Sequence, residues 1–302
     1  MRPPGRKNFQ MQTNFQGRDG FQWFTGVVED RADPLKVGRV RVRAVGYHTQ
    51  DLNILPTADL PWATVMQPTT SPAVSGLGTH TFLVEGTWVV GFWRDLDCQE
   101  PIILGSLPGI PTAEPDTTLG FNDPTGTYPS AKNVSDVNSL ARGTQTHTYT
   151  PDTVISEPAD PYGSVYPKNH VFATESGHTK EYDDTTGKER IKEKHKSGTF
   201  YEIHPNGDKV TRIVNDKYEI VAGNESVHIS GSVTLNIDTN CTTNITGNWD
   251  VNVAGNITID GNTINLNSGT KGAAREGDVV SDVDPIGDGV ISGKSSTVFI
   301  GG

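Results

Sequence analysis

The chain has 302 residues, a formal net charge of -11, 33 glycines, 19 prolines and only 33% hydrophobic residues. This composition favours several small β modules over one large core, and the negative charge disfavours non-specific binding to nucleic acid. No signal peptide or membrane span is expected, and Cys98 and Cys241 fall in different predicted modules, so synthesis in a reducing cytoplasm without a disulfide framework fits.

The N-terminal part of the chain predicts a flexible arm followed by a small β barrel. Residues 1–20 are polar and glycine-rich without periodicity, and we expect a poorly anchored arm there. Residues 21–110 contain five β-type runs separated by Pro, Gly and Asp clusters. These runs are FTGVVED, GRVRVRAVGY, PWATVMQ, THTFLVEGTWVVGFW and PIILGSL. Five short strands in a stretch of this length predict a closed barrel, and the OB-fold is the commonest solution of that size.

The second of these runs alternates Arg39, Arg41 and Arg43 with Val40 and Val42. We therefore expect a basic stripe that faces out of the barrel. One interpretation is a surface that tracks the phosphates of a single-stranded nucleic acid. The other is a solvated or partner-facing strand, which we favour because the stacking aromatics that nucleic-acid binding needs are not interleaved on this strand.

The barrel motifs resemble a known family. WFTGVVEDRADPLKVGRVRVRAVGYH, followed by LPWATVMQP, VEGTWVVGFW and ILGSLPG, is similar to the N-terminal OB domain of the central baseplate spike of T-even-type contractile-tailed bacteriophages, and more distantly to VgrG spikes of type VI secretion. The similarity covers most of residues 23–126. It implies a homotrimer in the virion tail baseplate, made in the host cytoplasm, whose OB domain contacts a baseplate hub protein. The tip would touch the host membrane transiently, and no nucleic-acid partner is implied.

Residues 111–169 are rich in Pro, Thr, Ser and Asp and predict a linker. In the T-even spike this region carries a lysozyme domain, which is much longer. Because the segment here is short and has no apolar helical pattern, we expect no catalytic residues and no enzymatic activity. A carboxylate pair of the glycoside hydrolase type has no place in it.

Residues 170–220 resemble the strands that lead into the prism of phage and VgrG spikes. We expect successive strands joined by turns at 184–187 and 205–207. Asp183 and Asp184 are interpreted as turn formers. Four histidines in this region match no zinc pattern, so we expect no metal ligands among them. They are His170, His178, His195 and His204.

Residues 221–268 carry the most regular pattern of the chain. From Val221 to Ile259 the odd-numbered residues are mostly aliphatic or Gly, while the even-numbered ones are almost all polar, which predicts extended chain with one buried face. Within the alternation, glycines recur every eight residues, with Thr239 in the one vacant slot. A Gly inside a strand marks a bend. The octad glycines are Gly223, Gly231, Gly247 and Gly255.

An octad extends only about 26 Å, too little for one chain to wrap around a filled interior. We therefore predict three identical chains, each forming one face of a triangular β-prism, so that every strand edge is paired. A sandwich or meander is the alternative, but it needs turn signals that are missing between Val221 and Asp260. The predicted interior comprises Val221, Val227, Ile229, Val233, Leu235, Ile237, Cys241, Ile245, Trp249, Val251, Val253, Ile257 and Ile259.

The C-terminal residues predict a different module. At Gly261 the alternation slips by one residue, so the regular prism should end there. Residues 269–302 resemble a PAAR-type conical tip in AAREGD and GKSSTVFIGG, with about one repeat per chain, so that three chains would build one cone. Such tips usually bind zinc through His and Cys, which this segment lacks, and we expect no cofactor. The four aspartates near residues 278–288 are interpreted as solvated turns rather than cation ligands.

The sequence therefore predicts an all-β protein with an OB barrel, a trimeric β-helix and a small tip. We interpret it as a structural, non-enzymatic spike driven through the host cell envelope by contraction of a tail sheath. The alternatives are a cell-envelope hydrolase or depolymerase spike, a VgrG-type secretion spike and a nucleic-acid-binding OB protein.

Overall fold

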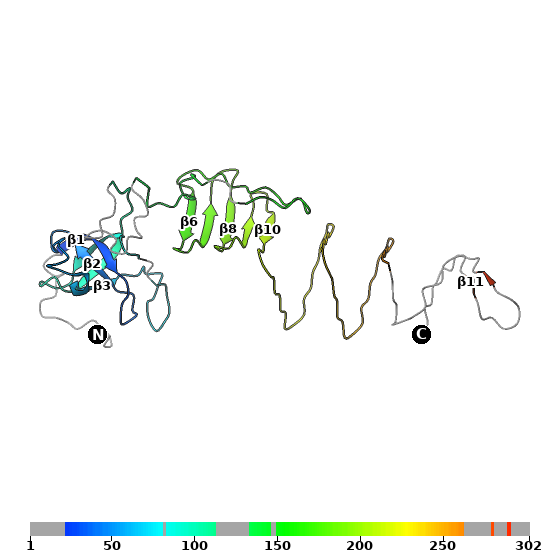
Figure 1. Ribbon diagram of the computed structural model, residues 1–302, viewed down its shortest axis with the longest axis horizontal. Helices are drawn as coiled ribbons and strands as arrows, with labels where there is room; N and C mark the ends of the chain where they lie inside the picture. Colours follow the sequence, from blue (N-terminus) through cyan, green and yellow to red (C-terminus); the bar gives the residue numbers. More distant parts are fainter. Residues whose placement is uncertain are drawn as a thin grey trace. The chain divides into compact units, whose positions relative to one another are not determined.

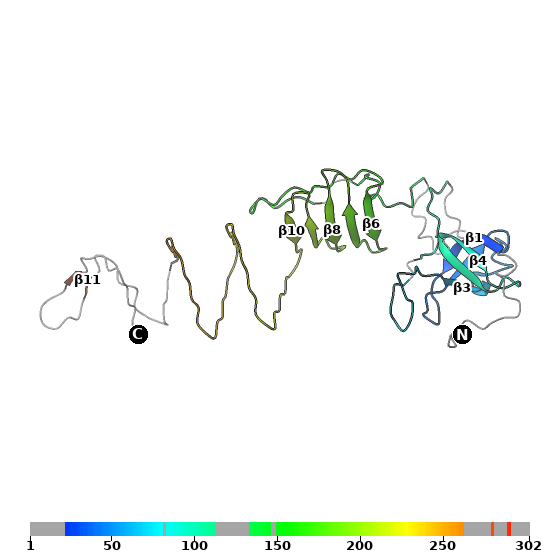
Figure 2. The same ribbon diagram turned by 180° about the vertical axis from the view of Figure 1, so that it is seen from behind.

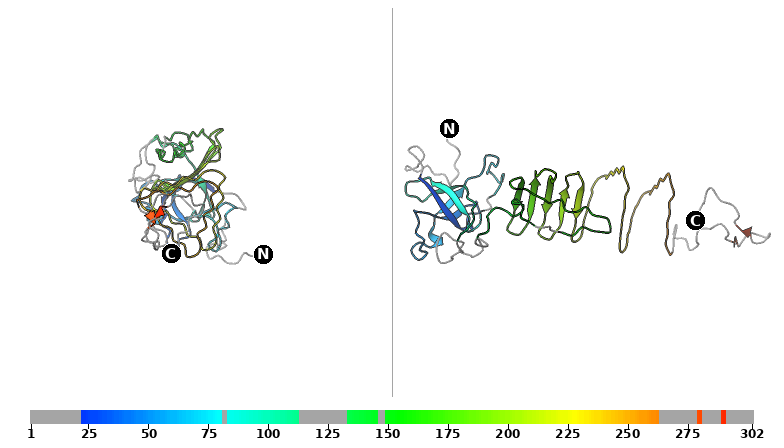
Figure 3. Two further views of the ribbon diagram at one scale, coloured as in Figure 1. Left: turned by 90° about the vertical axis from the view of Figure 1, so that its right-hand side faces the viewer. Right: turned by 90° about the horizontal axis from the view of Figure 1, so that it is seen from above.

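The computed structural model of the chain describes residues 22–80, 83–112, 133–145, 149–262, 279–280 and 289–290. Figures 1, 2 and 3 show the strands as arrows from four directions. The chain divides into two compact units, Met1–Ser230 and Gly231–Gly302. The described residues form strands, turns and one short 3-10 helix, Thr57–Asp59, and no α-helix. The predicted all-β class is confirmed.

The first module is a five-stranded closed barrel with the strand order β1-β2-β3-β5-β4. Its strands are β1 (Gln22–Asp30), β2 (Val40–Ala44), β3 (Trp62–Val65), β4 (Trp88–Trp93) and β5 (Pro101–Ser106). All pairs are antiparallel except β3 with β5, which closes the barrel in parallel. Each strand lies in one of the five runs expected from the sequence, except that β1 begins two residues before its run, and the OB-type barrel is confirmed.

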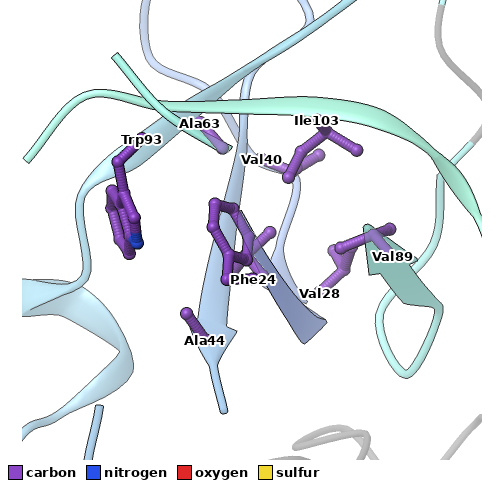
Figure 4. Packing of buried hydrophobic residues seen from close by; sticks show 9 residues of the cluster. Phe24, Val28, Val40, Ala44, Ala63, Val89, Trp93 and Ile103 are labelled. Carbon is purple, nitrogen blue, oxygen red and sulfur yellow. The ribbon is translucent and has the colours of Figure 1, made fainter. Parts of the chain in front are cut away.

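The barrel interior is filled by aliphatic and aromatic side chains. Figure 4 shows Phe24, Trp93 and the smaller residues around them pointing toward one another from all five strands. The Phe24 and Trp93 rings lie 4.8 Å apart. Two glycines allow this close packing, because a Cβ at Gly26 or Gly91 would lie within 2.6 Å of a backbone carbonyl oxygen of the facing strand. The core comprises Phe24, Val28, Val40, Val42, Ala44, Ala63, Val89, Trp93 and Ile103.

The second module is an antiparallel five-stranded sheet in which each strand pairs with the next along the chain. Its strands are β6 (Asn169–Ala173), β7 (Thr179–Asp183), β8 (Arg190–Lys194), β9 (Phe200–Ile203) and β10 (Lys209–Arg212). The turns expected at 184–187 and 205–207 join β7 to β8 and β9 to β10. In Figure 1 these strands stand side by side, and a second stretch of green chain runs along them.

Beyond β10 the described chain forms no strand until the short hairpin of β11 (Val279–Val280) and β12 (Gly289–Val290). Figure 1 draws the yellow to orange stretch as a repeatedly bent line. Most of the predicted tip, the phase slip at Ile264 and Leu266, and the four aspartates near residues 278–288 lie outside the described residues.

Candidate functional site

The octad segment bends with a strict period of eight residues. Bends occur at residues 214–215, 222–223, 230–231, 238–239, 246–247 and 254–255, and the chain is straight between them. One of these bends falls at Thr239, where the octad has no glycine. The period therefore belongs to the whole segment and not only to its glycines. The sequence pattern predicted the five bends from residue 222 to residue 255, and the structure adds one at residues 214–215.

The aliphatic residues of the predicted interior lie uncovered on a single chain. Their side chains are 44% to 75% exposed, and Cys241 is an exposed free thiol. Monomeric proteins rarely expose contiguous apolar surface of such extent, and large exposed patches mark interaction sites. A Cβ at any of the four octad glycines would meet no atom within 4 Å. A single chain thus leaves both the side chains and the bends of this segment without neighbours.

The backbone of this segment is unpaired as well. Between residues 213 and 262 the structure places no strand and no backbone–backbone hydrogen bond. Extended chain presents a row of N–H and C=O groups that templates pairing with another chain. The segment therefore combines an uncovered apolar face with two uncovered strand edges.

The sheet β6–β10 buries a charged face. Arg190 lies at its centre, with Nη2 2.5 Å from Glu181 Oε2 and Nη1 3.1 Å from Glu202 Oε1. Lys192 Nζ lies 3.3 Å from the other oxygen of Glu202. All four side chains are at most 3% exposed. Because buried charges are expensive unless paired, this network requires its partners to be held in place.

Those partners are held by residues 138–145 and 149–166, which we call the cover. Asp160 of the cover completes the network, with Oδ1 3.5 Å from Arg190 Nη1 and Oδ2 3.3 Å from Lys192 Nζ. Burial tends to raise the Asp160 pKa, but Lys192, Arg190 and the backbone N–H of Tyr162 outweigh it and hold the pKa below its ordinary value. The cover, which falls within the linker expected at residues 111–169, therefore packs as part of the sheet module.

Further contacts fix the cover across the whole sheet. Ser164 Oγ donates a hydrogen bond to Asp183 Oδ2, and Asp183 Oδ1 accepts one from the Thr185 N–H at 2.9 Å. At the other end, the ring of Tyr149 lies 4.9 Å from that of Phe200. Burial and the neighbouring carboxylates raise the pKa of Tyr149. Asp183 thus serves both as the turn former expected and as an anchor for the cover.

The opposite face of the sheet carries apolar side chains with no cover. Tyr182, Ile191 and Ile203 follow one another across β7, β8 and β9, because Ile191 pairs with both neighbours in register. Phe172 and Tyr182 are about half exposed. The uncovered face therefore combines an apolar row with charged residues such as Lys180 and Glu193, which are paired across β7 and β8.

The basic stripe expected on β2 is not solvent-exposed as a stripe. Arg43 is fully buried, with Nε 2.6 Å from Glu29 Oε1, and it also donates to the backbone carbonyl of Thr49 at 2.7 Å. The loop after β2 folds back over it. Arg39 is paired with Asp33 at 2.6 Å. The expectation of an outward-facing stripe was wrong for Arg43, because a loop covers that part of the strand.

The four histidines of the sheet module are not gathered into one cluster. His178 and His195 are brought together, with ring centroids 4.5 Å apart. Each accepts a backbone N–H at Nδ1, from Lys196 and Ser197, respectively. A neutral ring that accepts at Nδ1 keeps its proton on Nε2, whereas a ligating nitrogen must be bare. Within the described ranges, no group of three or more His, Cys, Asp or Glu is arranged to hold a metal ion.

The remaining two histidines lie apart from that pair. His170 is exposed and lies 3.5 Å from the Asp184 carboxylate. His204 is buried beside Glu202, at 3.7 Å. Neither lines either of the two cavities described below.

Two cavities in the described part of the chain bear on catalysis. The larger, about 1110 Å³, lies beside β3 and β5, and Glu100 is its only acidic residue. The smaller, about 220 Å³, lies under the cover and contains Asp160 and Glu181. Both carboxylates are paired with Arg190, and a general acid needs a raised pKa, the opposite of the Asp160 shift. Neither cavity provides the carboxylate pair of a glycoside hydrolase.

The described residues contain no helix with the length and apolar character that crossing a membrane requires.

The closed barrel defines the N-terminal module as an OB-type domain. The family model of the Gp5 N-terminal OB domain matches residues 46–185. Protein Gp5 of Vibrio phage KVP40 is 40% identical over 264 residues, which cover 71% of this chain and 63% of the relative. The pre-baseplate central spike protein Gp5 of Enterobacteria phage T4 is 47% identical over 131 residues, which cover 41% of this chain and 23% of that protein. The chain thus spans less than two thirds of either relative, and its resemblance to the baseplate spikes of T4-like phages is confirmed.

Proposed function

We propose that the protein is a structural, membrane-piercing central spike of a contractile-tail baseplate, located in the virion tail. The observation that carries this proposal is the octad segment, in which regular bends, uncovered aliphatic side chains and an unpaired backbone coincide. The printed name of the T4 relative, a pre-baseplate central spike protein, supports the same role.

Three chains would cover the odd-numbered aliphatic side chains and pair the strand edges of residues 221–262 at once. Each chain would form one face of a triangular prism, the odd-numbered aliphatics would meet inside, and each strand edge would pair with a neighbouring chain. The apolar row of Tyr182, Ile191 and Ile203 would join the same interior. The even-numbered Asn, Thr and Ser residues would stay in water and keep the shaft soluble.

The proposed mechanism is mechanical. Each fully buried aliphatic side chain contributes about 1.5 to 3 kcal/mol, and the octad segment of each chain offers many of them. A dry interior of this kind resists bending and unfolding, so sheath contraction can drive the prism forward through the envelope. The OB domain would contact the baseplate hub, and a tip built from the C-terminal residues of three chains would touch the membrane transiently. No cofactor or nucleic acid takes part in this mechanism.

We infer that the spike acts without enzymatic activity. The two described cavities lack an available carboxylate pair, which disfavours a hydrolase within those residues. Zymography on peptidoglycan and on capsule tests this inference, and we expect no cleared zone. A cleared zone produced by the purified full chain would replace the mechanical role with a hydrolytic one.

The oligomeric state is the decisive measurement for the proposal. Mass photometry should show three copies, electron microscopy should show a needle, and the assembly should resist SDS and heat well beyond the roughly 45 to 65 °C of ordinary mesophilic domains. A monomer, or a globular particle that melts in the ordinary range, would overturn it.

A further inference from the structure

The cover contains an exposed apolar turn at residues 152–157, which we call the tip of the cover. Asp152 and Glu157 close this turn, because the Glu157 N–H donates a hydrogen bond to the Asp152 carbonyl at 2.8 Å. Asp152 Oδ1 also accepts the Val154 N–H at 2.7 Å, and the Asp152 N–H donates to Glu157 Oε2 at 2.6 Å. The turn presents Val154 and Ile155, whose exposed fractions are 72% and 63%. The described loop therefore holds two large aliphatic side chains in solvent.

The base of this tip is fixed to the end of the sheet. Arg212, the last residue of β10, donates from Nη1 to the Thr150 carbonyl at 2.8 Å and lies 3.4 Å from Glu157 Oε2. Its guanidinium also lies 5.4 Å from the ring of Tyr149. The chain leaves the sheet after the same residue and enters residues 214–221, which we call the first octad. The tip and the first octad thus share one anchor.

The first octad carries an apolar patch on the side that should be polar. From residue 216 to 260, the even-numbered positions hold only two large apolar residues, Tyr218 and Ile220. They are 82% and 91% exposed, the most exposed large hydrophobic residues in the described part of the chain. If Val221 faces the interior and the alternation extends back through this octad, Tyr218 and Ile220 point outward, and the Lys217–Glu219 ion pair lies on the inward side. The interior of the proposed prism then leaves Tyr218 and Ile220 uncovered.

The two apolar groups lie within reach of each other. Tyr218 is six residues from Arg212, an extended reach of about 20 Å, and Val154 is four residues from Thr150, a reach of about 13 Å. Both groups nevertheless stay exposed on the single chain, although they belong to the same compact unit. A partner from outside the chain is therefore needed to cover them.

We propose that the tip of each cover, Val154 and Ile155, docks on Tyr218 and Ile220 of a neighbouring copy of this chain. This inference rests on the proposed trimer, in which winding brings a neighbour's first octad beside each sheet module. We call this contact the clamp, because it spans the junction between the sheet and the octad segment from outside. It covers the only large outward apolar residues of the described octad segment.

Cysteine cross-linking tests the contact. The variant carries Ile155→Cys and Ile220→Cys, with Cys98→Ser and Cys241→Ser to remove the native thiols. After oxidation, boiling and non-reducing electrophoresis, we expect covalent dimers and trimers. The matched control pairs Ile155→Cys with Asn244→Cys, an outward position three octads further along, and should give none. A link confined to single chains, or no link in a chain that mass photometry shows to be trimeric, overturns the clamp and leaves the spike proposal intact.

A second variant keeps the test decisive if the cysteine-substituted chain does not assemble. Val154→Ser with Ile155→Ser, made in the parent sequence, should lower the melting temperature of the trimer. The control Thr153→Ser changes the same turn without removing an apolar contact and should leave it unchanged. An unchanged melting temperature in the double variant overturns the clamp, whereas a monomeric parent chain overturns the spike proposal itself.

Discussion

Arg43 and Glu29 form a salt bridge that is completely buried in the wall of the OB barrel, with Nε 2.6 Å from Oε1 and Nη2 2.9 Å from Oε2. Glu29 lies where the register between β1 and β2 shifts between Val28 and Asp30. Thr57 donates a further hydrogen bond to Glu29 Oε2 at 2.8 Å. The pair therefore ties β1, β2 and the loop after β2 together.

Removing one partner of this pair should destabilise the barrel strongly. Glu29→Ala leaves a buried guanidinium without its counter-charge, which typically costs about 3 to 5 kcal/mol. Urea unfolding of the full chain, followed by tryptophan fluorescence, measures the loss. The control Asp30→Ala breaks the partly exposed pair with Arg41 and should cost at most about 1 kcal/mol. Equal losses in the two variants would contradict the prediction.

The close approach of β4 to β5 predicts that alanine destabilises the barrel at Gly91 but not at Gly105. Gly91→Ala places a Cβ 2.3 Å from the Ile102 carbonyl oxygen and 2.8 Å from the Phe24 ring, and overpacking of this kind typically costs about 1 to 3 kcal/mol. Gly105→Ala, on β5, meets no atom within 4 Å and should be nearly neutral. Thermal unfolding of both variants checks this, and similar melting temperatures would be the contrary result.

Asp33 should make the barrel sensitive to acid. Its side chain accepts from Arg39 and from backbone N–H groups, and the Arg39 hydrogen bond is the main cause that holds its pKa well below the ordinary value. A lowered folded-state pKa contributes stability that is present above the unfolded pKa of about 3.9 and is lost as the pH falls toward the folded value. The stability advantage over Asp33→Asn should therefore be full at pH 6 and shrink below about pH 4. A constant advantage of wild type over Asp33→Asn would refute the assignment.

Asp160→Asn should loosen the cover from the sheet. The substitution keeps the shape of the side chain but removes the charge that Arg190 and Lys192 face. Hydrogen–deuterium exchange of residues 149–166 should become faster, while the barrel strands are unaffected. Asp208→Asn, in the exposed turn before β10, is the control, and unchanged exchange in the cover would show that Asp160 does not hold it.

Ile237→Asp should abolish assembly of the octad segment, because three carboxylates would meet in a dry interior. Asn236→Asp adds the same charge on the neighbouring outward position and should leave the oligomer intact. Mass photometry distinguishes the two. A trimer that survives Ile237→Asp would argue that the odd-numbered face is not the interior.

The sequence predicted the local periodicity of the chain well, but it did not predict which distant segments pack over one another. The octad bends could be predicted, even at Thr239, because alternation and period are properties of neighbouring residues. The burial of Arg43 could not, since it depends on a distant loop folding back over β2. The cover was also missed. Glu181, Arg190 and Lys192 alternate like the solvent face of a strand, and only their pairing with Asp160 shows that the chain returns across them.

The bend at residues 238–239 recurs on schedule without a glycine, so the spacing is a property of the repeat and not of one residue type. A change in length by one whole repeat would leave all later residues on their original faces, whereas any odd-numbered change would turn them inside out. The reach of such a rod would therefore evolve in discrete steps, by gain or loss of complete modules. Its length would then be a whole multiple of the length of one octad.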